Sequence, residues 1–213
     1  MKKIVLLGDS IRKGYDKYVR MAFEEVAEVY YPSENCRFTT YMLRNLTEWV
    51  DEMQCGSDVD LVHWNAGLWD DLVLIDGLPL VPIDMYKENV ERICGMLKVL
   101  FPKAKIVFAT STSVREELFD KLRVKRYNKD TERYNQAAKD AVLRCEGQIN
   151  DLYALTKDAP LEYHSDQTHY YTMEGTRLLT DQVIGCIENA LDIKAKPLHY
   201  ETYFSEKKDI CGL

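Results

Sequence analysis

Two stretches at opposite ends of the sequence hold side chains that together could catalyse acyl transfer. Ser10 follows Gly8 and Asp9, at the point where a short apolar run resembling a buried strand ends. A serine hydroxyl is a weak nucleophile at neutral pH, so it needs a base within hydrogen-bond reach and a carboxylate that orients the base. Asp166 and His169 offer that pair, because a carboxylate three residues before a histidine on a loop can turn back and accept from the imidazole.

Acyl transfer also needs hydrogen-bond donors aimed at the oxyanion that develops on the attacked carbonyl. Ser10 lies at an expected helix N-terminus, where backbone N–H groups have no acceptor within the helix. Asn65, at the end of a later apolar run, can add a side-chain N–H. Both positions can therefore supply donors.

Each of these residues also has an ordinary structural explanation. Asp9 and Ser10 are residue types that favour helix N-caps, so the pair could act as a cap alone. His63 lies inside an apolar strand, where we expect a hydrogen-bonded core histidine, and His164 is expected to be a bystander. The basic run 123–126 is expected to form a solvated face.

The segments that must position these side chains alternate between strand-like and helix-like patterns. The expected strands are 3–7, 28–31, 60–64, 105–110 and 148–150, and the expected helices are 11–26, 38–53, 85–101, 129–146 and 173–191. Such alternation predicts an α/β fold: a mostly parallel five-stranded sheet with helices on both faces. Ligands bind such sheets at the carboxyl ends of the strands, so Ser10 and Asn65 should meet there.

Bulk properties exclude several classes of protein. The chain has 213 residues, of which 46% are hydrophobic, and a net charge of -7, which argues against a nucleic-acid partner. No stretch predicts a membrane span, and the N-terminal apolar run is too short for a signal peptide. The six cysteines are scattered without a CxxC pair, so we expect reduced thiols, no metal site and a cytoplasmic location.

In this order, the sequence blocks resemble the SGNH (GDSL) hydrolases, which are esterases and acylhydrolases on a flavodoxin-like three-layer α/β/α fold. The resemblance is based on the Gly-Asp-Ser block at 8–10, on Asn65, and on the Asp-x-x-His block at 166–169, and it extends over residues 3–191. It implies an SGNH hydrolase domain over 1–194. Residues 195–213 are then a C-terminal extension that packs on the domain or on a partner.

The resemblance also implies roles for individual residues. Ser10 is the nucleophile, His169 the general base and Asp166 its orienter, and no metal or cofactor is needed. The oxyanion hole is formed by the Ser10 amide, the Asn65 side chain and one further backbone amide. In the family that last donor is usually a glycine after the second strand. The stretch 32–39 contains no glycine, and Cys36 lies nearest the expected place.

The substrate is expected to be a small-molecule or carbohydrate ester with a short acyl group, above all acetyl. Trp64 replaces a residue that is often glycine in the family, which suggests a reshaped pocket, and Trp69 offers a second aromatic face for sugar rings. Asp9 is grouped with them as a substrate-binding residue. The apolar stretches 72–75 and 78–81 leave open a lysophospholipase or thioesterase acting on longer chains. A non-catalytic binding protein and a homo-oligomer also remain open.

Overall fold

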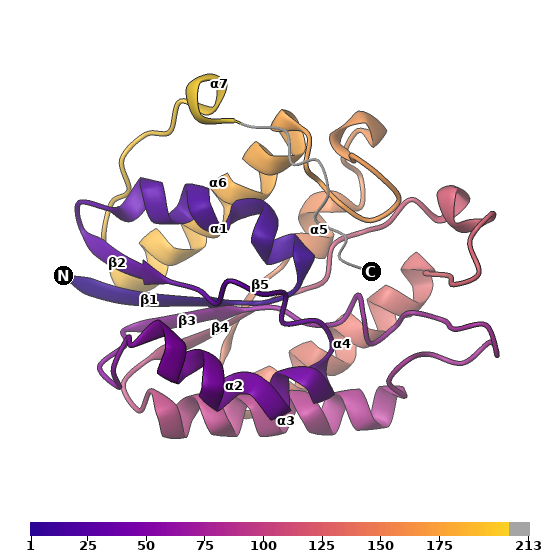
Figure 1. Cartoon of the computed structure of the whole chain (residues 1–213), viewed down its shortest axis with the longest axis horizontal. Helices are drawn as coiled ribbons and strands as arrows, with labels where there is room; N and C mark the ends of the chain where they lie inside the picture. The colour runs from indigo at the N-terminus through magenta and orange to yellow at the C-terminus, as the bar shows by residue number, and fades with distance from the viewer. Residues whose placement is uncertain (205–213) are drawn as a thin grey trace.

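The computed structural model describes residues 1–204, which form a parallel sheet between two layers of helices (Figure 1). The sheet has five strands: β1 (Lys2–Leu7), β2 (Ala27–Tyr30), β3 (Leu61–Trp64), β4 (Lys105–Ala109) and β5 (Gln148–Asn150). Their order is β2-β1-β3-β4-β5, and every neighbouring pair is parallel. This confirms the fold class predicted from the sequence.

The strands are apolar because both faces of the sheet are covered. Alternate side chains of β1 point to opposite faces: Val5 and Leu7 pack in one core, while Ile4 and Leu6 pack in the other. The first core lies under α2 (Thr39–Met53), α3 (Ile83–Leu100) and α4 (Asn128–Arg144). The second core lies under α1 (Ser10–Phe23) and α6 (Met173–Leu191), near the short α5 (Leu152–Thr156).

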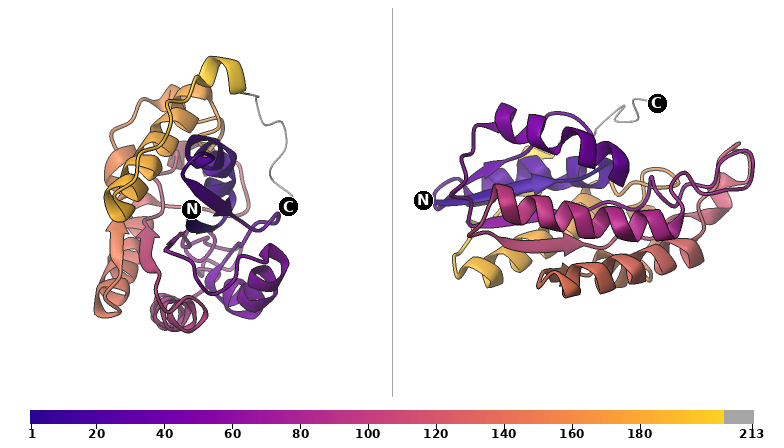
Figure 2. Two further views of the ribbon diagram at one scale, coloured as in Figure 1. Left: turned by 90° about the vertical axis from the view of Figure 1, so that its left-hand side faces the viewer. Right: turned by 90° about the horizontal axis from the view of Figure 1, so that it is seen from below.

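The views agree on these layers. Figure 1 shows α1 and α6 above the sheet and α2 and α3 below it. Figure 2 shows α3 lying between α2 and α4, seen from below. Because the strands are parallel, all of them end on the same side of the sheet. The loops that follow β1, β3 and β4 therefore gather at the carboxyl end of the sheet.

Two loops that the sequence did not define form an outer rim at that end. We call segments 68–81 and 115–127 the rim loops. The first follows β3 and the second follows β4 and contains the short 3-10 helix η1 (Glu116–Phe119). Val73 and Lys125 join the loops by exchanging two backbone hydrogen bonds, each 2.9 Å long. A second 3-10 helix, η2 (Leu161–Tyr163), precedes the loop that contains His169.

The segment after α6 returns along the outside of α1 and ends in α7 (Tyr200–Tyr203). The backbone N–H of Lys196 donates to the carbonyl of Ala22 at 2.8 Å, and the Tyr200 hydroxyl donates to Asp181 at 2.7 Å. The Tyr200 ring also packs on Tyr18. The predicted extension 195–213 therefore contacts the domain over the part that the structure describes, and its remainder lies outside the described residues.

Among residues 1–204, no helix is long and apolar enough to cross a bilayer, and no three His, Cys, Asp or Glu side chains group as metal ligands. The cysteines in this part of the chain are all free thiols. Cys211 lies outside the described residues.

Candidate active site

Ser10 is placed by a sharp change of direction between β1 and α1. Gly8 adopts a φ of 155°, and a Cβ at this position would lie 1.9 Å from the Asn65 Oδ1. Glycine is therefore required both for the backbone conformation and for the close approach of Asn65. Asp9 is the N-cap of α1, with its Oδ1 accepting from the N–H of Ile11 at 2.9 Å. Ser10 thus begins α1 at the carboxyl edge of the sheet.

The three residues proposed as a triad form one continuous chain of hydrogen bonds. The Ser10 Oγ lies 2.8 Å from the His169 Nε2, and the His169 Nδ1 lies 2.7 Å from the Asp166 Oδ2. The other carboxylate oxygen of Asp166 accepts from the backbone N–H groups of Thr168 and His169 at 2.7 and 2.8 Å. The structure therefore brings these residues together from positions 159 apart in the chain.

The electrostatics of this chain suit a base paired with an orienting anion. Burial tends to raise the pKa of Asp166, but the hydrogen bond and charge of His169 outweigh it and lower that pKa to about 2. Asp166 is therefore ionised at neutral pH. It accepts from His169 Nδ1–H, which leaves Nε2 as the nitrogen that can take the Ser10 proton.

Tyr171 packs against the face of the His169 imidazole. The sequence patterns did not predict this residue as part of the site. Its ring stacks on His169 with a centroid distance of 4.6 Å and an interplanar angle of 13°. Its hydroxyl donates to the backbone carbonyl of Ser10 at 2.6 Å. The only signal in the sequence is that Tyr171 lies two residues after His169, which does not show that it reaches Ser10.

Asn65 is oriented by Asp9, the residue before Ser10. Its Nδ2 donates to the Asp9 Oδ1 at 2.9 Å, and its backbone N–H donates to the carbonyl of Leu7 at 3.1 Å. An amide nitrogen has two hydrogens, and the bond to Asp9 uses only one of them. Burial raises the pKa of Asp9, while the hydrogen bonds from Asn65 and Ile11 act against that rise.

A cavity of about 260 Å³ opens over Ser10 and His169. The two rim loops form its apolar walls, with Leu68, Trp69, Leu72, Phe119, Leu122 and Val124. Its polar lining comes from Asn35, Gln167, Thr168, Arg123 and Arg126. The candidate nucleophile and base therefore lie on one wall of a small, mostly apolar pocket.

Comparisons with known proteins identify this fold. No protein-family model matches the sequence, and no curated protein matches it.

Three solved structures resemble this chain closely in shape. A lipase/acylhydrolase from Enterococcus faecalis is 19% identical, with a TM-score of 0.69, covering 93% of this chain and 100% of that one. A GDSL-like lipase from Bacteroides thetaiotaomicron is 18% identical, with a TM-score of 0.67 and 89% coverage of each chain. An acetyl xylan esterase is 15% identical, with a TM-score of 0.66, covering 87% of this chain and 99% of that one. The chain has the fold of the GDSL-type acylhydrolases.

Within this GDSL-type fold, two residues predicted to bind substrate lie away from the cavity. Trp64 is fully buried, and its ring packs edge-on against Phe108 at 4.8 Å in the core under α2, α3 and α4. Asp9 is also fully buried, because it caps α1 and holds Asn65. The prediction that these two side chains contact substrate is wrong. Trp69 does line the cavity and is partly exposed.

The prediction that the Cys36 backbone amide is the third oxyanion donor is also wrong. Its backbone N–H already donates to the carbonyl of Gly8 at 3.0 Å, and the residue is fully buried. The left-handed conformation that favours glycine occurs one residue later, at Arg37, where φ is 53°. The Arg37 N–H donates to the Asn35 side chain at 2.8 Å, and Asn35 lines the cavity. The turn 35–37 therefore faces the site, with a different register from the one expected.

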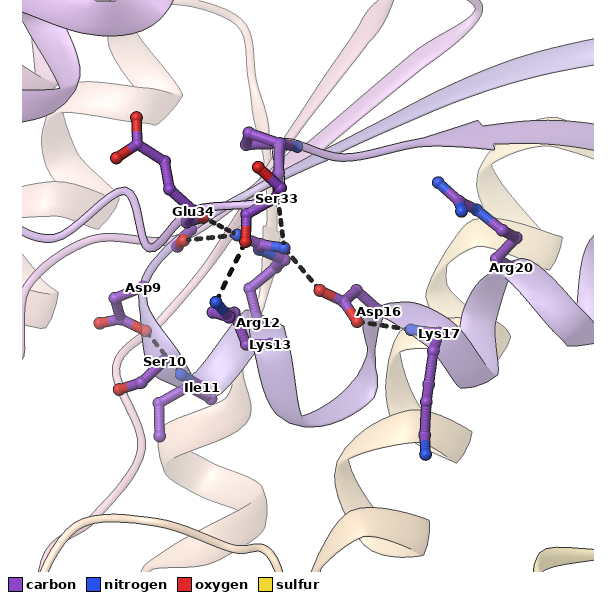
Figure 3. A network of polar contacts seen from close by, with 12 residues as sticks. Asp9, Ser10, Ile11, Arg12, Lys13, Asp16, Lys17, Arg20, Ser33 and Glu34 are labelled. Atoms are coloured by element: carbon purple, nitrogen blue, oxygen red, sulfur yellow. Dashed lines mark hydrogen bonds and ion pairs between the residues drawn. The ribbon is translucent and has the colours of Figure 1, made fainter. Parts of the chain in front are cut away.

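A buried arginine fixes this turn to α1. The Arg12 guanidinium donates to the Asp16 carboxylate at 2.5 Å and to the carbonyls of Pro32 and Glu34 at 3.1 and 2.6 Å (Figure 3). A longer contact of 3.5 Å reaches the carbonyl of Gly8. Arg12 is only 1% exposed and is not among the residues that line the cavity. It joins the loop after β2 to the helix that begins at Ser10.

The two remaining histidines near the sheet do not belong to the site. His63 is fully buried, and its Nε2 hydrogen-bonds the Asn150 side chain at 3.0 Å. His164 packs against the ring of Tyr170 at 4.0 Å. Burial lowers the pKa of each to about 4, so both are neutral at pH 7. The predicted bystander roles of His63 and His164 agree with these positions.

Proposed function

We propose that this protein is a serine esterase that hydrolyses short-chain acyl esters, acetyl esters foremost. The observation that supports this most directly is the unbroken hydrogen-bond chain from Ser10 through His169 to Asp166, at the wall of a small cavity. The likeness in fold to esterases and acylhydrolases supports the same reaction class.

In the proposed reaction, the Ser10 Oγ attacks the ester carbonyl carbon while His169 Nε2 takes the hydroxyl proton. The carbonyl oxygen becomes an oxyanion, which the Ser10 N–H and the second Nδ2 hydrogen of Asn65 stabilise. The tetrahedral intermediate collapses, and the alcohol leaves with the proton from His169. Water then attacks the acyl-enzyme by the same route, giving the acid and free Ser10. Asp166 stays ionised throughout and stabilises the imidazolium.

The size of the cavity supports a short acyl group. Trp64 gives no support, because it is buried in the core. A volume of about 260 Å³ is below the range of about 300–1,000 Å³ that drug-sized ligands occupy. Trp69 on the wall is suited to packing against a sugar ring, and one neighbour of the same fold is an acetyl xylan esterase. An acetylated carbohydrate is therefore the substrate we favour.

The apolar walls favour a second candidate, a lysophospholipase or thioesterase acting on longer chains. Leu68, Leu72 and Leu122 would contact an acyl chain, and Ile75 and Leu78 expose apolar side chains on the first rim loop. If the cavity continued along this loop, longer esters would be bound more tightly.

A panel of 4-nitrophenyl esters from acetyl to octanoyl, together with acetylated xylooligosaccharides, tests both candidates. Short esters and acetylated sugars should give the highest kcat/KM. A fluorophosphonate probe should label the wild type and fail to label Ser10→Ala. Labelling that persists in Ser10→Ala would show that another residue is the nucleophile.

A further inference from the structure

The basic run at 123–126, expected from the sequence to be a solvated face, lies beside the cavity that contains Ser10. Arg123, Val124 and Arg126 all line the cavity, and Lys125 holds the second rim loop by donating to the carbonyls of Phe119 and Asp120. Two guanidinium groups are therefore placed at a small apolar pocket in a chain whose net charge is -7.

Arg126 has an evident structural role. Its guanidinium lies 3.7 Å from the buried Asp71 carboxylate. It also donates to the carbonyl of Leu68 and, at 3.2 Å, to the Thr168 hydroxyl. These contacts join both rim loops to the loop that contains His169, so the charge of Arg126 is largely used within the protein.

Arg123 has no such role. It is exposed, and within residues 1–204 no carboxylate lies within ion-pair distance of it and no group accepts a hydrogen bond from it. The cavity lining itself contains no acidic residue. The carboxylate of Asp166 is already paired with His169. Within the part of the chain that the structure describes, Arg123 therefore presents a guanidinium without a protein anion at the pocket that contains Ser10.

We propose that Arg123 forms an anion-binding subsite, so that the preferred substrate is a short-chain ester whose alcohol part, a sugar or another group, also carries a carboxylate or a phosphate. This inference is based on the proposed esterase function and specifies its substrate class. The apolar walls would hold the body of the substrate, and the acid group would pair with the guanidinium at the rim. Arginine suits this role because its planar fork can donate two parallel hydrogen bonds to either kind of anion.

Matched esters measure this preference directly. The neutral substrate is methyl 4-acetoxybenzoate, and the anionic ones are 4-acetoxybenzoate and 4-acetoxyphenyl phosphate, which distinguish a carboxylate from a phosphate. The wild type should show a higher kcat/KM for at least one anionic ester than for the neutral one. Arg123→Gln should lower that ratio about threefold to tenfold, as expected for one partly exposed charge pair. The ratio of the two kcat/KM values is the readout, because a general effect of the substitution on the cavity changes both esters alike.

Lys121→Gln is the control variant. Lys121 is exposed, lies two residues from Arg123 and does not line the cavity, so this substitution removes the same charge from the same loop. The control should keep the wild-type ratio. An equal fall in Lys121→Gln, or a wild type that prefers the neutral ester, would overturn the subsite.

A binding measurement separates this inference from the proposed function. Calorimetry on Ser10→Ala with 4-acetoxybenzoate should detect binding that the additional Arg123→Gln substitution weakens about threefold to tenfold. Turnover of the neutral ester with no Arg123-dependent binding would overturn the subsite alone. Arg123-dependent binding without turnover of any ester by the wild type would support the subsite while refuting the esterase.

Discussion

The Asn65 side chain donates to the Asp9 carboxylate at 2.9 Å, so the residue before the nucleophile orients the amide expected to bind the oxyanion. The same Asp9 oxygen accepts from the N–H of Ile11 and caps α1. One buried carboxylate therefore fixes two things at once: the start of the helix at Ser10 and the direction of the Asn65 amide.

Replacing Asp9 should separate these two roles. Asp9→Ser keeps a good N-cap residue but is too short to reach Asn65. We expect the free energy of unfolding to change by about 1 kcal/mol or less, and kcat to fall about 10²-fold, as for loss of one oxyanion donor. Asn65→Ala should give a similar loss of kcat, and the double variant should be no worse than either single one. Additive losses in kcat would show that Asp9 does not act through Asn65.

The triad should behave as a unit in kinetic measurements. Ser10→Ala and His169→Ala should each remove nearly all turnover of 4-nitrophenyl acetate, and combining them should cost little more. Asp166→Asn should lower kcat about 10⁴-fold, because it favours the wrong imidazole tautomer. His164→Ala is the control, since His164 packs on Tyr170 outside the hydrogen-bonded chain. If His164→Ala were as inactive as His169→Ala while remaining folded, the assignment of the base would be wrong.

Arg12 should contribute strongly to the stability of the fold, although it does not line the cavity. Arg12→Met leaves the Asp16 carboxylate and the carbonyls of Pro32 and Glu34 without their donor in a buried place. Breaking a buried ion pair costs about 3–5 kcal/mol in unfolding free energy. Urea unfolding should show a loss of that size, and Arg12→Met/Asp16→Leu should recover part of it. A double variant less stable than Arg12→Met would contradict this account.

Asp70 should lower the stability of the fold as pH rises from about 4 to 7, while His63 and His164, whose pKa values burial lowers to about 4, act in the opposite direction up to about pH 6.5. Burial raises the pKa of Asp70 from 3.8 to about 7, although hydrogen bonds from Thr39 oppose the rise. Between these values the folded protein holds a proton that the unfolded chain releases, so raising the pH favours unfolding. One such group contributes up to about 1.4 kcal/mol per pH unit.

Asp70→Asn removes this titration and keeps an oxygen that can accept from Thr39. The free energy of unfolding of both proteins is measured in urea between pH 4 and 8, and the value for the wild type should fall with pH relative to that for the variant. Asp71, whose pKa burial raises to about 6, and the two buried histidines titrate in both proteins, so the difference between the two curves reports Asp70. Parallel curves for the two proteins would show that Asp70 does not titrate in this range.

The sequence allowed prediction of the features that depend on local pattern. The sequences of β1 and β3 are largely apolar runs, which predict buried parallel strands. Parallel strands end at one edge of the sheet, which places Ser10 and Asn65 together. Asp166 and His169 are close because they are only three positions apart on one loop. The contact of Ser10 with His169 spans 159 positions, and only the resemblance of the ordered blocks to a known family pointed to it.

Predictions failed where burial or register depends on distant packing. Trp64 and His63 alternate along β3, and nothing local shows that the face of Trp64 is covered by α2 and α3. Cys36 lies nearest the expected donor position in a turn without glycine, but Arg37 is the residue that adopts the left-handed conformation. The pairing of Val73 with Lys125 joins two loops without a hydrophobic period, so the cavity wall could not be foreseen.

Acyl-chain preference should depend on Trp69 and not on Trp64. Trp69 lines the cavity, so Trp69→Ala should enlarge the pocket and shift the preference from acetyl toward butyryl and longer esters. Each methylene that the enlarged pocket accepts adds about 0.8 kcal/mol, or about fourfold in kcat/KM. Trp64→Phe is the control: it removes part of a buried ring, so it should lower thermal stability and leave the chain-length profile unchanged. A wild-type kcat/KM that rises from acetyl through octanoyl would refute the short-acyl proposal and favour the lysophospholipase or thioesterase.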